Sequence, residues 1–241
     1  MIYDAHFHAE DASLLQYMQA NHITGIVNAA SPQEFQRLSA WLKTDNTIKI
    51  SAGIHPWYAQ RSSWEQMLPI MEQASIIGEI GLDNVWCDVD FSIQTELFER
   101  SLAYAAQNHK PVILHLKGME KEALPLLRKY KNHYFVHWYS CDSYLDEYIA
   151  LDCYFSIGPS VYKDRAVQQV VKNVPLQRLL LESDGLSALS WCEQRQISLH
   201  RYSSIMQRTV SCIETITGQS NMDVCLNQNL KRFIAFSESQ R

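Results

Sequence analysis

Apolar residues along the chain fall into short runs that alternate with longer segments of helical periodicity. The short runs are rich in β-branched and aromatic residues, which is typical of strands. Eight strands are predicted in this way, over residues 2–8, 23–29, 47–54, 75–82, 111–116, 133–138, 153–157 and 179–182. Runs such as Leu179-Leu180-Leu181 are apolar throughout, which favours strands covered on both faces, as in a parallel sheet.

The segments between the runs carry apolar residues at helical spacing. Helices are predicted over residues 12–21, 32–43, 63–73, 91–108, 120–131, 143–150 and 165–173, and a tail over 199–236 gives two more, broken near residues 218–221. Eight alternating units predict an α/β fold, a closed (β/α)8 TIM barrel. Because no repeat or linker interrupts the pattern, we expect a single domain over residues 1–241.

Polar residues stand where several of these strands end, which is the rim that carries the active site in such a barrel. The first run holds His6 and His8, whose spacing of two residues points both side chains to one face. The other candidates at strand ends are Glu79 in the fourth run, His115 in the fifth, His137 in the sixth and Asp184 after the eighth.

Imidazoles and carboxylates together suit divalent ions such as Zn²⁺ and Mn²⁺, and carboxylates alone can hold Mg²⁺. Six ligands exceed the needs of one tetrahedral ion, so we predict two ions that share a bridging carboxylate and activate water. Glu79 is the predicted bridge, and Asp184 is predicted to bind metal and accept a proton from the water. The alternatives are a salt bridge for Glu79, a helix N-cap for Asp184 and core hydrogen bonds for the histidines.

Further residues are candidates for substrate contact. His55 ends the third run, and with six ligands already present we assign it to a substrate phosphate rather than to metal. Lys117 is predicted to contact backbone oxygens of the substrate. Trp138, Tyr139 and Trp191 are candidates for stacking on bases, with packing at the rim as the alternative.

Composition narrows the class of protein. A net charge of −5 argues against sequence-independent binding of duplex nucleic acid, for which a basic surface is usual. No apolar run approaches the roughly 20 residues that a membrane span needs. The six cysteines form no Cys-x-x-Cys pair, so we expect reduced thiols in a cytoplasmic protein, either a monomer or a weak oligomer.

Eight motifs of this chain, taken in order, resemble those of the TatD family of metal-dependent hydrolases. They are Asp4-Ala5-His6-Phe7-His8, Gly53-Ile54-His55-Pro56, Gly78-Glu79-Ile80-Gly81-Leu82-Asp83, Lys110-Pro111-Val112-Ile113-Leu114-His115, His137-Trp138-Tyr139-Ser140, Ser156-Ile157-Gly158, Leu181-Glu182-Ser183-Asp184 and Asn229-Leu230-Lys231-Arg232-Phe233. The resemblance runs almost end to end, and the order and spacing of the motifs make it specific.

The resemblance implies a TIM barrel of the amidohydrolase-like group with DNase activity, commonly 3′ to 5′ on single strands. Carried over by position, it implies one metal held by His6, His8, Glu79 and Asp184, and a second held by Glu79, His115 and His137. Three segments depart from the family pattern, and all three follow proposed ligands: Leu116-Lys117-Gly118, Cys141, and residues 185–192. The predicted ligands are all present, so the departures concern the loops that face substrate.

The favoured hypothesis is therefore a two-metal 3′–5′ exonuclease that acts on single-stranded DNA. One alternative keeps the metals and changes the bond, giving a deacylase that acts on D-aminoacyl-tRNA or on a small ester or amide. The acidic balance and the unusual loops favour this alternative slightly. The other alternative is a non-catalytic protein that works in a complex, because fold alone does not fix function.

Overall fold

A computed structural model describes residues 2–43 and 47–236. Its strands form one parallel sheet in the order β1 to β8. The strands are β1 (Tyr3–Phe7), β2 (Thr24–Ala29), β3 (Ile48–Ala52), β4 (Ile76–Asp83), β5 (Val112–Lys117), β6 (Tyr134–Val136), β7 (Tyr154–Ile157) and β8 (Leu179–Leu181). Every residue of β1 and β4 is buried, as expected for strands covered on both faces.

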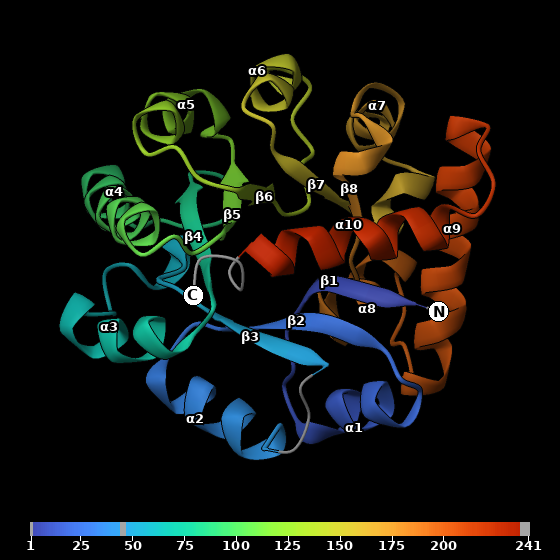
Figure 1. Cartoon of the computed structure of the whole chain (residues 1–241), viewed down its shortest axis with the longest axis horizontal. Coiled ribbons are helices and arrows are strands. Elements are labelled where there is room, and N and C mark those ends of the chain that lie inside the picture. Colours follow the sequence, from blue (N-terminus) through green and yellow to red (C-terminus); the bar gives the residue numbers. More distant parts are fainter. Residues whose placement is uncertain (1, 44–46, 237–241) are drawn as a thin grey trace.

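Helices follow the strands and surround them, as Figure 1 shows. The helices are α1 (Ala12–Ala20), α2 (Pro32–Trp41), α3 (Trp64–Gln73), α4 (Phe91–Gln107), α5 (Glu120–Lys129), α6 (Leu145–Ala150), α7 (Arg165–Asn173), α8 (Gly185–Glu193), α9 (Tyr202–Thr217) and α10 (Met222–Phe236). Short 3-10 turns add η1 (Pro56–Tyr58), η2 (Pro159–Tyr162), η3 (Leu176–Arg178) and η4 (Leu199–Arg201).

The last strand returns to the side of the first. The backbone N–H of Asp184 donates to the carbonyl of His6 over 3.1 Å, and that of Ser183 donates to the Asp4 carboxylate over 2.9 Å. The chain thus forms a nearly closed barrel with interleaved helices, and the predicted (β/α)8 architecture is confirmed.

Helix α10 closes the end of the barrel at which the strands begin. In Figure 1 it lies across the ring of strands. Its Phe233 packs edge-on against Phe135 of β6 and Tyr154 of β7, with ring centroids 5.6 and 5.5 Å apart. Its Asn229 donates to the carbonyl oxygens of Leu176 and Leu179. This packing leaves the opposite end, where the strands finish, available for a functional site.

The predicted elements match the structure with a few informative differences. Strands β6 and β8 are shorter than predicted, so His137 and Glu182 lie just after them, while Asp184 follows the last strand as predicted. Trp138 and Asp184 adopt left-handed backbone conformations, with φ of 45° and 57°. Helix α8 was not predicted from the pattern. Among the described residues, no helix has both the length and the apolar character that crossing a membrane requires.

Candidate metal centre

The six predicted ligands meet at the open end of the barrel. A cavity of about 480 Å³ lies there, and its lining includes His8, Glu79, His115, His137 and Asp184. The side chain of His6 is fully buried beside them. The ligands come from residues 6 to 184 of the chain, and parallel strands bring them to a single rim.

The carboxylate of Glu79 lies at the centre of this group and is 1% exposed. One of its oxygens, Oε2, is 3.3 Å from Nε2 of His6 and 2.9 Å from Nε2 of His8. The other, Oε1, is 3.4 Å from Nδ1 of His115 and 3.3 Å from Nε2 of His137. Each carboxylate oxygen therefore faces its own pair of imidazoles, an arrangement that would suit a bridge between two ions.

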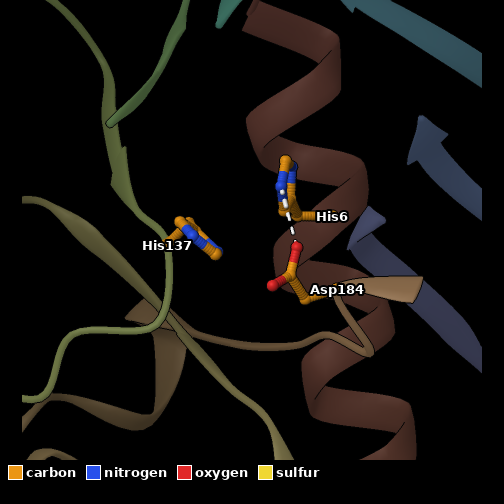
Figure 2. A group of neighbouring side chains, drawn as sticks. All are labelled: His6, His137 and Asp184. Atoms are coloured by element: carbon orange, nitrogen blue, oxygen red, sulfur yellow. Dashed lines mark ion pairs between the residues drawn. The ribbon is translucent and has the colours of Figure 1, made fainter. Parts of the chain in front are cut away.

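Asp184 completes the half of the site that contains His6 and His8. Its Oδ1 is 3.5 Å from Nε2 of His6 and 3.6 Å from Nε2 of His8. Figure 2 shows His6 and Asp184 facing each other, with His137 entering the same space from a separate segment of the chain. Ligand atoms of these three residues all lie within 4.8 Å of one another.

The distances and the hydrogen bonding fit divalent ions. Two ligand atoms each about 2.1 Å from one ion, at a tetrahedral angle, stand about 3.4 Å apart, close to the distances found here. Three groups of possible ligands overlap in the site, and two of them contain Glu79. Nε2 of His6, Nδ1 of His115 and Oδ1 of Asp184 are buried without a hydrogen-bond partner. Buried polar atoms are normally paired, so these atoms are suited to coordinate an ion.

The pKa of each group in the centre depends on the charges beside it. Burial disfavours a charged ring at His6, but the carboxylates of Glu79 and Asp184 outweigh burial and raise the pKa of His6. Burial also opposes ionisation of Glu79, yet the surrounding imidazoles hold its pKa well below the usual range. For His115, the hydrogen bond to Asp83 and the nearby carboxylate of Glu79 overcome burial and raise the pKa to about 9. Metal binding at this site would therefore displace protons.

Two buried carboxylates orient His115 and His137, the histidines that face Oε1 of Glu79. Glu182 accepts from Nδ1 of His137 over 3.1 Å, and Asp83 accepts from Nε2 of His115 over 3.0 Å. An ionised carboxylate can only accept, so each bond fixes the ring proton on that nitrogen and turns the other nitrogen toward Glu79. Sequence reasoning did not assign these roles, although both residues lie in the motifs that carry Glu79 and Asp184.

Other supporting residues were also missed. Asn28 donates to Oε2 of Glu79 over 3.3 Å and accepts from Ser51 over 3.0 Å. Asp4 accepts from the Tyr202 hydroxyl over 2.6 Å, and its burial raises its pKa to about 7. The available signal was a lone polar residue inside an apolar run, as with Asn28 and Ser51.

Gly81 explains how β4 and β5 bring Glu79 and His115 together. The two strands pair in a register that sets Gly81 opposite His115. A Cβ atom on Gly81 would stand 1.7 Å from the carbonyl oxygen of His115, which no side chain could accommodate. The missing side chain is therefore a condition for this strand pairing.

His55 lies on the Oε1 side of Glu79, with its Nε2 3.9 Å away, and belongs to one of the possible ligand groups. Its Nδ1 accepts from the backbone N–H of Trp57 over 3.2 Å. Burial and the neighbouring His115 lower the pKa of His55 to about 3, so the ring is neutral. With Nδ1 accepting, Nε2 carries the proton and faces the cavity as a donor.

The remaining candidates for substrate contact divide into two groups. Lys117, Trp138 and Trp191 line the cavity. Tyr139 lies outside it: the ring is 1% exposed, packs against Phe155, and its hydroxyl donates to the carbonyl of Ser143. This corrects the prediction that Tyr139 stacks on substrate, because the left-handed turn at Trp138 sends the next side chain into the core.

Comparisons with known proteins show the family of the chain. The model of the family described as TatD related DNase matches residues 3–234. The metal-dependent hydrolase YjjV of Escherichia coli is 28% identical over 188 residues, which are 73% of each chain. The 3′-5′ ssDNA/RNA exonuclease TatD of Edwardsiella piscicida is 30% identical over 147 residues, which are 56% of each chain.

Solved structures share the fold. The crystal structure of Escherichia coli YjjV has a TM-score of 0.81 and 21% identity, and the match covers 98% of this chain and 96% of that one. A TatD family hydrolase from Entamoeba histolytica has a TM-score of 0.75 and 14% identity, covering 98% and 97%.

Proposed function

Because the chain belongs to the family of TatD-related DNases and is a metal-dependent hydrolase, we propose that it is a two-metal 3′–5′ exonuclease of single-stranded DNA. The proposal rests on the position of the Glu79 carboxylate. Its two oxygens each face a separate pair of imidazoles. The name of the similar Edwardsiella piscicida protein supports the choice of substrate.

His6, His8 and Asp184 would hold one ion together with Glu79, and His115 and His137 would hold the other. When bound, two divalent ions polarise a phosphate and lower the pKa of an attacking water. Zn²⁺ and Mn²⁺ suit this mixture of imidazole and carboxylate, and Mg²⁺ suits its carboxylates.

The protein's own groups then have distinct tasks. Oδ1 of Asp184 is the oxygen suited to hold an ion, so the other carboxylate oxygen of this cavity-lining residue is the one that can accept the proton of the attacking water. The protonated Nε2 of His55 can donate to a phosphate oxygen. Lys117 lines the same cavity and supplies a positive charge for the neighbouring phosphate.

We propose the cytoplasm as the location of this activity, a choice supported by the free state of all six cysteines. The binding partner that we expect is the single-stranded nucleic acid substrate. The protein would act on it as a monomer or a weak oligomer.

The test is digestion of a single-stranded oligonucleotide labelled at its 5′ end, with Mg²⁺ or Mn²⁺ and with chelator. We expect a ladder that shortens from the 3′ end, needs metal, and is lost in Glu79→Gln and His115→Ala. The matched control is His200→Ala, because His200 is exposed and does not line the cavity.

Intact DNA in the presence of protein-bound metal would overturn the nuclease proposal. Aminoacyl esters and lactones are assayed with the same preparations. Cleavage of one of these that disappears in Glu79→Gln would assign the site to the deacylase alternative.

A further inference from the structure

Aromatic side chains gather around the mouth of the cavity. Among the described residues, the large hydrophobic side chains with the greatest exposure include Tyr58 at 40%, Trp86 at 56% and Trp191 at 63%, and all three line the cavity. Exposed apolar surface of this kind is costly in water, and its concentration at the rim of a site marks a surface for binding.

Three tryptophans from different parts of the chain contact one another there. Trp86 lies between β4 and α4, Trp138 follows β6, and Trp191 lies on α8. The ring centroids of Trp86 and Trp191 are 6.1 Å apart, and those of Trp138 and Trp191 are 6.5 Å apart, with the rings steeply inclined.

One of these rings is held in place, whereas the other two are exposed. The backbone N–H of Trp138 donates to Ser156 and to Glu182, and its ring packs over Gly158. Stacked bases repeat about every 3.4 Å along a strand, so a base between two rings needs a separation of about 6.8 Å. The separations of 6.1 and 6.5 Å are close to this value, and the exposed Trp86 and Trp191 rings are the ones open to solvent.

The charges that line the cavity limit the number of substrate phosphates that it can neutralise. Lys117 is the one lysine or arginine among the described lining residues, and Glu34, Glu79, Asp164 and Asp184 supply four carboxylates. The Lys117 ammonium contacts Ser140 and lies over the Trp86 ring, 5.6 Å from its centroid. One such cation can neutralise one phosphate, whereas a groove that tracks a long strand needs many.

We propose that Trp86, Trp138 and Trp191 bind the base of the substrate's terminal nucleotide by stacking, while Lys117 contacts a phosphate of the same nucleotide. This inference rests on the proposed nuclease function and specifies it: the unit of recognition is one nucleotide with its base. Stacking is tolerant of sequence because every base presents a flat face.

The experiment compares two single-stranded oligonucleotides that differ only at the 3′ end, where one carries a normal nucleotide and the other an abasic one. Loss of a stacked base weakens binding by about 5- to 150-fold. We therefore expect the wild-type KM to rise by a factor in that range for the abasic end, with a smaller change in kcat. In a Trp86→Ala, Trp191→Ala double variant the two substrates should have nearly equal KM values.

Val224→Ala is the control, because Val224 is a half-exposed apolar residue of α10 that does not line the cavity. Equal KM values for the two oligonucleotides in the wild type would overturn the inference and leave the nuclease proposal standing.

Failure to cut either oligonucleotide would refute the nuclease proposal itself. In that case tryptophan fluorescence decides the stacking: quenching by deoxyadenosine monophosphate but not by deoxyribose 5-phosphate supports it, and equal responses overturn it.

Discussion

Replacement of Glu182 by glutamine tests whether the second half of the centre depends on a fixed histidine tautomer. Glu182 is fully buried and accepts two hydrogen bonds, from Nδ1 of His137 over 3.1 Å and from the backbone N–H of Trp138 over 2.9 Å. A glutamine keeps the shape but offers one oxygen, so one N–H must face the new amide NH₂. The Trp138 N–H has a second acceptor in Ser156, 3.0 Å away.

Both orientations of the glutamine are worse than the carboxylate. If its oxygen faces Trp138, the NH₂ favours a lone pair on Nδ1 of His137, which moves the ring proton to Nε2 and blocks the ligand. If its oxygen faces His137, the ring keeps its tautomer but loses a charge-assisted bond worth about 1.5–3 kcal/mol. Since about 1.4 kcal/mol is a factor of ten, we expect Glu182→Gln to weaken metal binding by about 10- to 100-fold.

Calorimetric titration of the chelated protein with Mn²⁺ measures this change, and circular dichroism checks that the fold is kept. Glu122→Gln is the matched control, because Glu122 lies exposed in the first turn of α5. His137→Ala sets the scale for loss of the ligand. Unchanged affinity in Glu182→Gln beside a weakened His137→Ala would show that Glu182 does not orient the ring. Unchanged affinity in both variants would remove His137 from the ligand set.

Three further predictions concern packing, pH and salt. Gly81→Ala should lower the free energy of unfolding, measured with urea, by about 3 kcal/mol or more, because its Cβ would overlap the His115 carbonyl. The control Gly218→Ala, with φ of +67° and open space around it, should lower it by about 1–2 kcal/mol. Equal losses in the two variants would contradict the close approach of β4 and β5. The folded-state pKa of His115, raised from 6.5 to about 9, stabilises the metal-free protein fully below pH 6.5, and this contribution is lost as pH rises to about 9. Thermal unfolding with chelator should show that decline, and a smaller decline in His115→Ala is the check, because His6 and His8 also have raised pKa values. Binding of an oligonucleotide should fall by only about 5- to 25-fold per tenfold rise in salt, as one or two neutralised phosphates imply; a much steeper slope would reveal a long cationic track.

The sequence was sufficient for the order of the strands and of every helix except α8, and for proposing the six ligands, because both depend on local signals. Apolar runs report burial on two faces, and in a parallel barrel the end of each run marks the functional rim. The His6 and His8 pair follows from the period of a strand alone. The family resemblance rested on the same short motifs, and the match over residues 3–234 confirms it.

Tertiary structure decided everything that depends on partners distant in the chain. Glu182 and Asp83 can orient His137 and His115 only because the fold brings each carboxylate within hydrogen-bond distance of its histidine. Asn28 reaches the carboxylate of Glu79 in the same way. Backbone direction after a strand is likewise a tertiary property: the left-handed turn at Trp138 keeps that ring at the cavity and buries Tyr139, although the two residues are adjacent in sequence. A one-dimensional pattern records which side chains are polar or apolar, but packing between separate segments determines which of them face the site.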